Sequence, residues 1–178
     1  MFSDIIIPPA PLSDPAVFQS LHEPLRSSES RRRWEIRFSP KLFQETVKDY
    51  YRLLFGVDRE IGRMRDELEK QGMGDNTVII FTSDHGFYLG ERGLAGKWFA
   101  HEESIRIPLL IHDPRNPGKR EQPLKELVLN IDLAPTILSY AGLSAPEQMQ
   151  GRSLTSLLMK PSSEWRSDFF YEHHFIPN

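Results

Sequence analysis

The 178-residue chain contains no cysteine, carries little net charge and has no long apolar run. Without cysteine it has no disulfide, no thiolate ligand and no thiol nucleophile, so any metal must be bound by oxygen and imidazole. Its 22 Lys and Arg residues nearly balance 25 Asp and Glu residues, giving a formal net charge of -3. This weak field does not favour binding to nucleic acid. No apolar run approaches the roughly 20 residues that cross a bilayer, so no membrane span is predicted.

The first 39 residues are rich in proline. Five of the 14 prolines lie within the first 24 residues. Proline fixes its own φ and pushes the preceding residue towards extended geometry, so residues 1–39 are predicted to form an extended strap over another part of the protein. Arg31, Arg32 and Arg33 are expected in a solvated loop without a function, and a phosphate-binding patch is the alternative.

Residues 40–71 carry the pattern of one long helix. Their apolar residues recur alternately at spacings of four and three, which places them on one helix face. Ser39 is the expected N-cap, with Pro40 at the first helical position. A coiled coil is the alternative, because the alternation persists over more than three heptads. Gly56 and Gly62 favour instead a helix that packs closely on a neighbouring element.

Two β-branched and apolar runs predict strands. Residues 76–82 have the composition of a parallel strand that is buried on both faces, and residues 107–111 form the second run. Residues 127–129 are expected to pair briefly, and residues 132–140 are expected to form a helix. Strand, helix and loop alternate in this way in an α/β sandwich. Ligands of open parallel sheets bind beyond the carboxyl ends of the strands, so residues 83–86 are candidates for chemistry.

Asp84 and His85 are the first candidate site residues. Just past the end of a strand, and with Gly86 releasing the chain, both side chains can converge on one divalent cation. A carboxylate suits calcium or magnesium and an imidazole admits zinc or manganese, so the pair does not fix the metal. The alternative is structural: Asp84 caps the following turn and His85 is an ordinary loop residue.

A longer stretch resembles a known family. Residues 76–97 read NTVIIFTSDHGFYLGERGLAGK and residues 101–108 read HEESIRIP. Downstream, the segments NIDLAPT at 130–136, AGL at 141–143 and QGRSL at 150–154 follow in order. Together these segments closely resemble the sulfatase family of the alkaline-phosphatase superfamily.

The resemblance implies a fold and a domain organisation. It covers residues 40–172 and looks most like bacterial carbohydrate sulfatases of the N-acetylglucosamine-6-sulfatase type. The implied fold is α/β, part of an alkaline-phosphatase-like sandwich with a mostly parallel sheet. Residues 1–39 would be the strap, 40–160 the sulfatase-like core segment and 161–178 the start of a truncated C-terminal subdomain.

The resemblance also implies residue roles. Asp84 and His85 match the family's later pair of metal ligands, for which calcium is the expected ion. Lys97 matches the lysine that contacts the sulfate, and His101 and His173 could line the substrate rim. The expected substrate is a sulfate ester of a small molecule or glycan, hydrolysed in a periplasmic, secreted or lysosomal compartment.

The sequence also departs from the family. The family nucleophile is a formylglycine made from Cys or Ser in a Cys/Ser-x-Pro/Ala-Ser-Arg motif; this chain has no Cys, and the serine candidate at Ser13 lacks the Arg. The chain is therefore expected to be a fragment that is inactive alone, marginally stable or self-associating. Glu102 and Arg106 are expected to form a structural i,i+4 pair. The alternatives are a phosphatase or phosphodiesterase of the same superfamily, or a non-catalytic sugar-binding or partner-completing domain.

Overall fold

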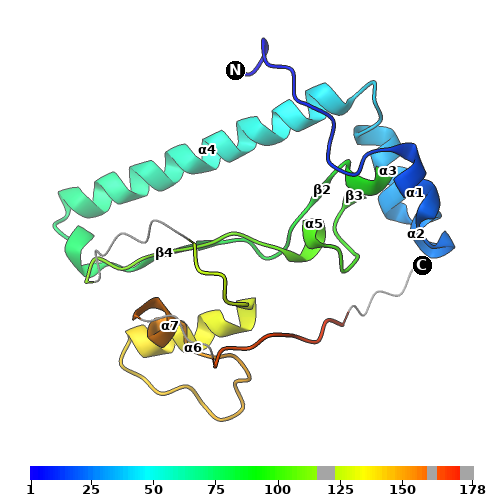
Figure 1. Cartoon of the computed structure of the whole chain (residues 1–178). Helices are drawn as coiled ribbons and strands as arrows, with labels where there is room; N and C mark the ends of the chain where they lie inside the picture. Colours follow the sequence, from blue (N-terminus) through cyan, green and yellow to red (C-terminus); the bar gives the residue numbers. More distant parts are fainter. Residues whose placement is uncertain (116–122, 160–163, 173–178) are drawn as a thin grey trace. The chain divides into compact units, whose positions relative to one another are not determined.

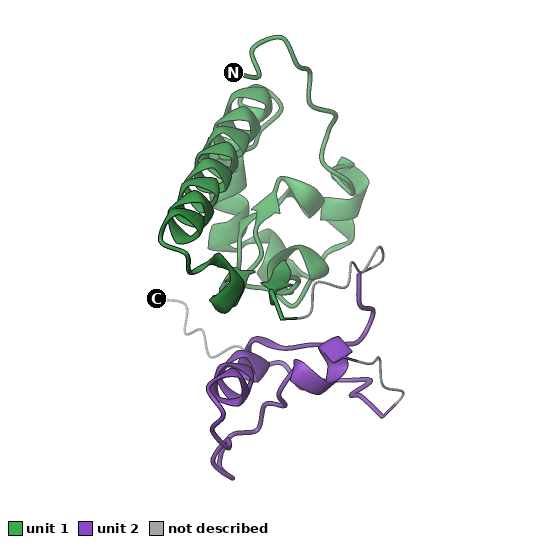
Figure 2. Ribbon diagram, turned by 90° about the vertical axis from the view of Figure 1, so that its left-hand side faces the viewer, with its two compact units in different colours: residues 1–117, 173–178 green, residues 118–172 purple. Residues whose placement is uncertain are grey.

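The computed structural model of the chain describes residues 1–115, 123–159 and 164–172. These residues divide into two compact units, shown in different colours in Figure 2. Residues 1–115 belong to the first unit, and residues 123–159 with 164–172 form the second. No helix within the described residues has both the length and the apolar character needed to cross a bilayer.

Three helices occupy the segment for which the sequence predicts an extended strap. They are α1 (Pro15–Ser20), α2 (Glu23–Arg26) and α3 (Glu29–Arg37). The prediction was wrong from Pro15 onwards, because proline is well accommodated at the start of a helix, where its fixed φ suits the helix and its missing N–H costs nothing. Residues 1–14 form no helix or strand, and Ile7 packs against the core and exchanges two hydrogen bonds with Gln44, as expected of a strap. The three arginines lie in α3, not in a loop.

The long helix is confirmed as α4 (Phe43–Lys70). It begins later than predicted: Leu42 is the N-cap, while the Ser39 carbonyl accepts hydrogen bonds from the two residues that precede and open the helix. A Cβ added at Gly56 or Gly62 would meet nothing within 4 Å, so the close packing expected at these glycines is not present. The 3-10 turn η1 (Gly74–Asn76) follows.

The two predicted strands pair with each other, but antiparallel. They are β1 (Ile79–Thr82) and β4 (Leu109–His112), with Ile79 opposite His112 and Thr82 opposite Leu109. A parallel pair needs a crossover, usually a helix on the face of the sheet. Here the intervening loop instead brings the chain back in the reverse direction, as Figure 1 shows. The strands are also less buried than predicted, and Leu110 is 63% exposed.

The loop between these strands contains four short elements. In chain order they are β2 (Tyr88–Leu89), η2 (Glu91–Gly93), β3 (Ala95–Gly96) and α5 (Glu102–Ile105). Strands β2 and β3 form a second antiparallel pair, with Tyr88 opposite Gly96. Ala95 packs with Phe38 and Val47 in the buried core of the first unit. The core therefore lies where this loop, α3 and the start of α4 meet.

The second unit is built around one buried carboxylate. Its elements are η3 (Asn130–Asp132), α6 (Leu133–Tyr140) and α7 (Thr155–Met159). The predicted helix at residues 132–140 is thus confirmed, whereas residues 127–129 form no strand. Asp132 has no exposed surface, and its carboxylate accepts hydrogen bonds from the backbone N–H groups of Leu129 and Arg152.

Candidate functional site

Asp84 and His85 lie two and three residues beyond the last residue of β1, and their side chains face each other. Asp84 Oδ2 is 3.5 Å from His85 Nε2. On the other side of the ring, Nδ1 lies 2.7 Å from the carbonyl oxygen of Gly86. A carbonyl oxygen can only accept, so Nδ1 carries a proton, and Nε2 is the ring atom left to bind a cation. A carboxylate oxygen of Asp84 and Nε2 of His85 therefore lie side by side, as two ligands of one cation require.

Gly86 fixes this turn against α5. Its N–H donates to the carbonyl of Ser104 at 2.7 Å, and a Cβ at this position would lie 2.3 Å from the carbonyl oxygen of Glu103. No other residue permits such a close backbone approach. The hydroxyl of Ser83 donates to the carbonyl of His85 at 2.9 Å and closes the turn from the preceding side.

The donor set fits a metal only in part. Within residues 1–115, 123–159 and 164–172, no three His, Asp or Glu side chains form a group that could hold an ion. The Asp84 side chain is 84% exposed, which leaves its oxygens accessible. Calcium takes 6 to 8 oxygen ligands, of which the Asp84 carboxylate can supply one or two. The His85 ring supplies a nitrogen, the donor that transition metals such as zinc prefer, so the pair fits as part of a larger ligand set and does not by itself select calcium.

Lys97 directly follows β3 and is exposed. The register of the second strand pair places Tyr88 opposite Gly96, so one further step sets Lys97 opposite Phe87, two residues from His85. The backbone thus carries Lys97 back towards the turn that holds the acidic and imidazole groups. That its ammonium points at the same space remains a prediction.

His101 points inwards, against a residue that the sequence did not single out. Its Nδ1 lies 2.6 Å from the hydroxyl of Tyr88, whose side chain has no exposed surface. The pKa of His101 is lowered, first by burial and then by the nearby charge of Arg92, while Glu103 opposes the shift. His101 is therefore held neutral near pH 7. The substrate-rim role stays a prediction; His173 lies outside the described residues.

The predicted ion pair between Glu102 and Arg106 is not the one that forms. Arg92 lies 3.4 Å from the carboxylate of Glu103, and both side chains are mostly buried. Among residues 1–115 no ion pair joins Glu102 to Arg106, which are linked by a backbone hydrogen bond. The i,i+4 rule applies to a regular helix, but α5 has only four residues and ends at Ile105. Arg92 adopts a left-handed backbone conformation with a φ of 58°, which is rare for a residue other than glycine and could not be predicted from the sequence.

Glu91 is a second residue that sequence reasoning missed. Its carboxylate accepts the N–H of Leu89 at 2.6 Å and so braces the turn between β2 and β3. Burial raises its pKa, partly offset by these backbone hydrogen bonds. The closely spaced glycines at 86, 90, 93 and 96 were the available signal that this loop folds tightly.

Comparison with known proteins identifies the family of the chain. A sulfatase family model matches residues 11–143. Over 138 residues the chain is 39% identical to an N-acetylglucosamine-6-O-sulfatase of Bacteroides thetaiotaomicron, which covers 76% of this chain and 25% of that protein. The chain thus spans about a quarter of the length of that relative.

Two solved structures share the fold. One, determined in complex with its substrate D-glucosamine-2-N,6-O-disulfate, has a TM-score of 0.72 and 32% identity, covering 92% of this chain and 36% of that one. The other, a phosphonate monoester hydrolase from Silicibacter pomeroyi, has a TM-score of 0.67 and 34% identity, covering 72% of this chain and 25% of that one.

Proposed function

The chain belongs to the sulfatase family, and from that premise we propose that it forms part of the active site of a hydrolase acting on sulfate esters of carbohydrates. The observation that carries the proposal is the turn after β1, where the Asp84 carboxylate and Nε2 of His85 lie 3.5 Å apart and Nδ1 is held by the Gly86 carbonyl. The turn lies within the residues that the family model matches.

In this proposal Asp84 and His85 are two ligands of a divalent cation, with calcium the expected ion. A cation held there would act as a Lewis acid towards the oxygens of the sulfate. The backbone around the turn orients both ligands before a cation binds. The Gly86 carbonyl fixes the tautomer of His85, and the hydrogen bond between Gly86 and Ser104 holds the turn in place.

Lys97 would contact the sulfate. Its ammonium supplies three donors and a fixed positive charge, which stabilise the negative charge that builds up as the ester bond breaks. His101 and His173 are proposed as residues of the substrate rim. Because the chain has no cysteine that could be converted to formylglycine, and its serine candidate Ser13 lacks the Arg of the motif, we propose that the nucleophile lies outside these 178 residues. The chain alone is then expected not to turn over sulfate esters.

A second candidate function is hydrolysis of a phosphate or phosphonate monoester. It is favoured by the similarity to the phosphonate monoester hydrolase, since a metal and a lysine serve either tetrahedral anion. The sulfated sugar in the other similar structure favours the first candidate. By family, either activity would operate in a periplasmic, secreted or lysosomal compartment.

The test compares two esters in one protein. The full reading frame that carries this chain is expressed and assayed with N-acetylglucosamine-6-sulfate and with N-acetylglucosamine-6-phosphate. We expect faster turnover of the sulfate ester, lost in Lys97→Ala and Asp84→Asn and retained in Lys41→Ala, a control at an exposed lysine. Faster turnover of the phosphate ester would select the second candidate. Absence of turnover of both esters, with sugar binding retained, would identify a non-catalytic sugar-binding domain.

A parallel measurement tests the chain by itself. The 178-residue chain is incubated with an aryl sulfate, and hydrolysis is compared with that of Lys97→Ala. Turnover by the chain that Lys97→Ala abolishes would contradict the proposal that the nucleophile lies elsewhere.

A further inference from the structure

Helix α3 lies against the strand that precedes Lys97 (Figure 1). The contact centres on Ser30, which is 1% exposed. Its hydroxyl donates to the carbonyl of Ala95 at 2.7 Å and accepts the N–H of Ala95 at 3.2 Å. Both backbone groups of this strand residue are thus satisfied by one side chain, in the place that a neighbouring strand would otherwise take.

Two arginines of the same helix extend the contact along the chain. Arg31 donates from Nη1 to the carbonyl of Gly93 at 3.2 Å. Arg33 places its guanidinium over the ring of Trp98, 4.7 Å from the ring centre. The helix therefore contacts the loop on both sides of Lys97.

Gly96, between Ala95 and Lys97, is also closely packed. Gly96 adopts a φ of 91°, and a Cβ there would lie 2.7 Å from the ring of Trp98. The indole thus packs directly on the glycine backbone, with the guanidinium of Arg33 also against the ring. Lys97 is exposed, but both of its neighbours are packed: Gly96 lies against the indole of Trp98, and Trp98 lies against Arg33 of α3.

We propose that Ser30 is a positioning residue for Lys97, and this inference rests on the proposed function. Lys97 has a long flexible side chain, so the position and direction of its Cα–Cβ bond decide where the ammonium can reach. That bond is set by Ala95, Gly96 and Trp98. Serine suits the task because a hydroxyl can donate and accept at once. Alanine would leave a buried N–H and a buried C=O of Ala95 without a partner, and the strand end that carries Lys97 would loosen.

The experiment compares Ser30→Ala with Ser30→Thr and Ser28→Ala in the 178-residue chain. Ser28 is the matched control because its hydroxyl caps the same helix, accepting the N–H of Arg31 at 3.3 Å. Nuclear magnetic resonance reports the backbone order of Lys97 from amide relaxation. Inorganic sulfate is then titrated while the side-chain signal of Lys97 is followed. Lys97→Ala provides the reference for sulfate bound elsewhere.

We expect Ser30→Ala to raise the mobility of Lys97 and to weaken sulfate binding at its ammonium by about fivefold to tenfold, less than full removal of a hydrogen bond to a charged group because the lysine is still present. Ser28→Ala should leave the mobility of Lys97 and the sulfate affinity unchanged. Ser30→Thr, which keeps the hydroxyl, should match the original chain in both measurements. A folded Ser30→Ala chain whose Lys97 is as ordered as in the original, with equal sulfate affinity, would overturn the inference.

Two further outcomes are separable. If Lys97→Ala does not weaken sulfate binding, the proposed function loses its lysine, while the relaxation data still decide whether Ser30 orders the loop. If Ser30→Ala does not fold, Arg33→Gln takes its place. This variant removes the guanidinium from the Trp98 ring at a half-exposed site. It should raise the mobility of Lys97, and an unchanged Lys97 would count against the inference.

Discussion

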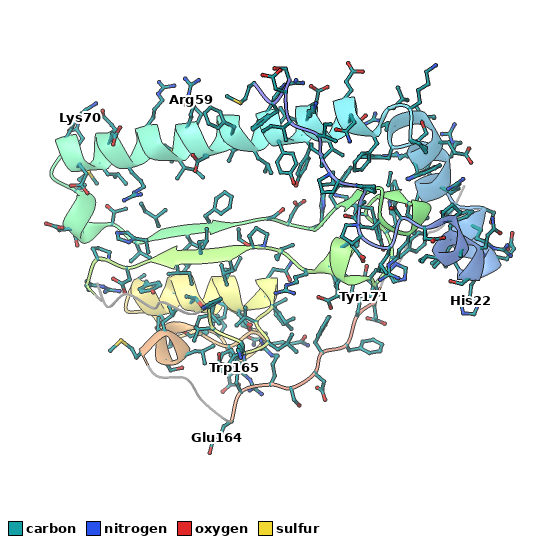
Figure 3. The ribbon with its side chains drawn as sticks, turned by 45° about the horizontal axis from the view of Figure 1, so that its top comes forward. His22, Arg59, Lys70, Glu164, Trp165 and Tyr171 are labelled. Atoms are coloured by element: carbon teal, nitrogen blue, oxygen red, sulfur yellow. The ribbon has the colours of Figure 1, made fainter. Side chains whose placement is uncertain are left out.

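Arg166 places its guanidinium across both carboxylate oxygens of Asp132, a residue 34 positions earlier with no exposed surface. The Nη2 atom lies 2.8 Å from Oδ1 and Nη1 contacts Oδ2. Backbone N–H groups of Leu129 and Arg152 occupy the remaining acceptor positions. The Asp132 carboxylate therefore joins three separate segments of the second unit, those that carry Leu129, Arg152 and Arg166. The neighbouring Trp165 (Figure 3) donates its indole N–H to the Leu127 carbonyl at 2.7 Å.

Replacing Asp132 by Asn should destabilise the second unit. The change leaves the mostly buried Arg166 without its counter-charge, and breaking a buried ion pair typically costs about 3–5 kcal/mol. Urea unfolding followed by the nuclear magnetic resonance signal of the Trp165 indole N–H, which is separate from those of Trp34 and Trp98 in the first unit, measures the loss. Asp168→Asn, at an exposed carboxylate in the same segment, should change the unfolding free energy by less than about 0.5 kcal/mol. Equal stability of the two variants would contradict this account of Asp132.

The same carboxylate should make the second unit sensitive to acid. Burial alone would raise the pKa of Asp132, but hydrogen bonds from Arg166, Arg152 and Leu129 outweigh burial and lower it. A lowered folded pKa means that the stabilisation is complete above the unfolded value, about 4, and is lost as pH falls through the folded pKa. Unfolding free energies measured from pH 6 to pH 2 should therefore decline below about pH 4. The decline should be shallower in Asp132→Asn, and parallel curves for the two proteins would refute the assignment.

Gly86→Ala should disrupt the candidate metal turn. The new Cβ would lie 2.3 Å from the backbone carbonyl of Glu103, which cannot rotate away as a flexible side chain could. The expected loss is about 1–3 kcal/mol, as for other overpacked sites, with shifted resonances of Asp84 and His85. Gly56→Ala is the matched control: nothing lies within 4 Å of its added Cβ in mid-helix, so it should raise the melting temperature. Identical spectra for Gly86→Ala and the original would show that the turn is not held by this contact.

The sequence predicted best what depends on local pattern. The four-three spacing identified α4, and the polar residues after the first apolar run identified the turn with Asp84 and His85. The family and fold class inferred from the quoted segments are confirmed by the family match and the structural neighbours. What the sequence could not give is pairing between distant residues. Ser30 and Ala95 are 65 positions apart, and neither their contact nor the antiparallel partner of β1 has a local signature.

Two of the errors have local physical causes. The proline-rich start was interpreted as extended, although an Asp before a Pro is also a helix start: Asp14 accepts the N–H of Ala16 at 2.7 Å and so caps α1. The arginines of α3 lie in a polar stretch with Ser27, Ser28 and Ser30, which favours a loop. Hydrogen bonds and ion pairs from Arg32 and Arg33 lower the pKa of Glu29 to about 2 and brace a helix that apolar periodicity does not reveal.

An apolar groove between α4 and the β1–β4 pair should make the chain self-associate. The groove, of about 310 Å³, is lined mainly by apolar side chains of these three elements. Arg59 and Lys70 lie on the opposite side of the helix, as Figure 3 shows. On the groove side, Leu54 and Val57 are nearly half exposed and Leu110 more so. Patches of this kind on a monomer drive association, because covering apolar area is worth roughly 25 cal/mol per Å².

Light scattering coupled to size-exclusion chromatography tests this association directly. The apparent mass of the chain should rise with concentration between about 1 and 100 µM, the range of weak interfaces that bury little area. Leu110→Lys should return the chain to a monomer, since it places a charge on the exposed face of β4 without removing a buried contact. Arg59→Ala, on the opposite side of the helix, should leave the association unchanged. A strictly monomeric sample with a cooperative melt above about 60 °C would instead show that the exposed groove costs the chain little, and would contradict the expectation of marginal stability.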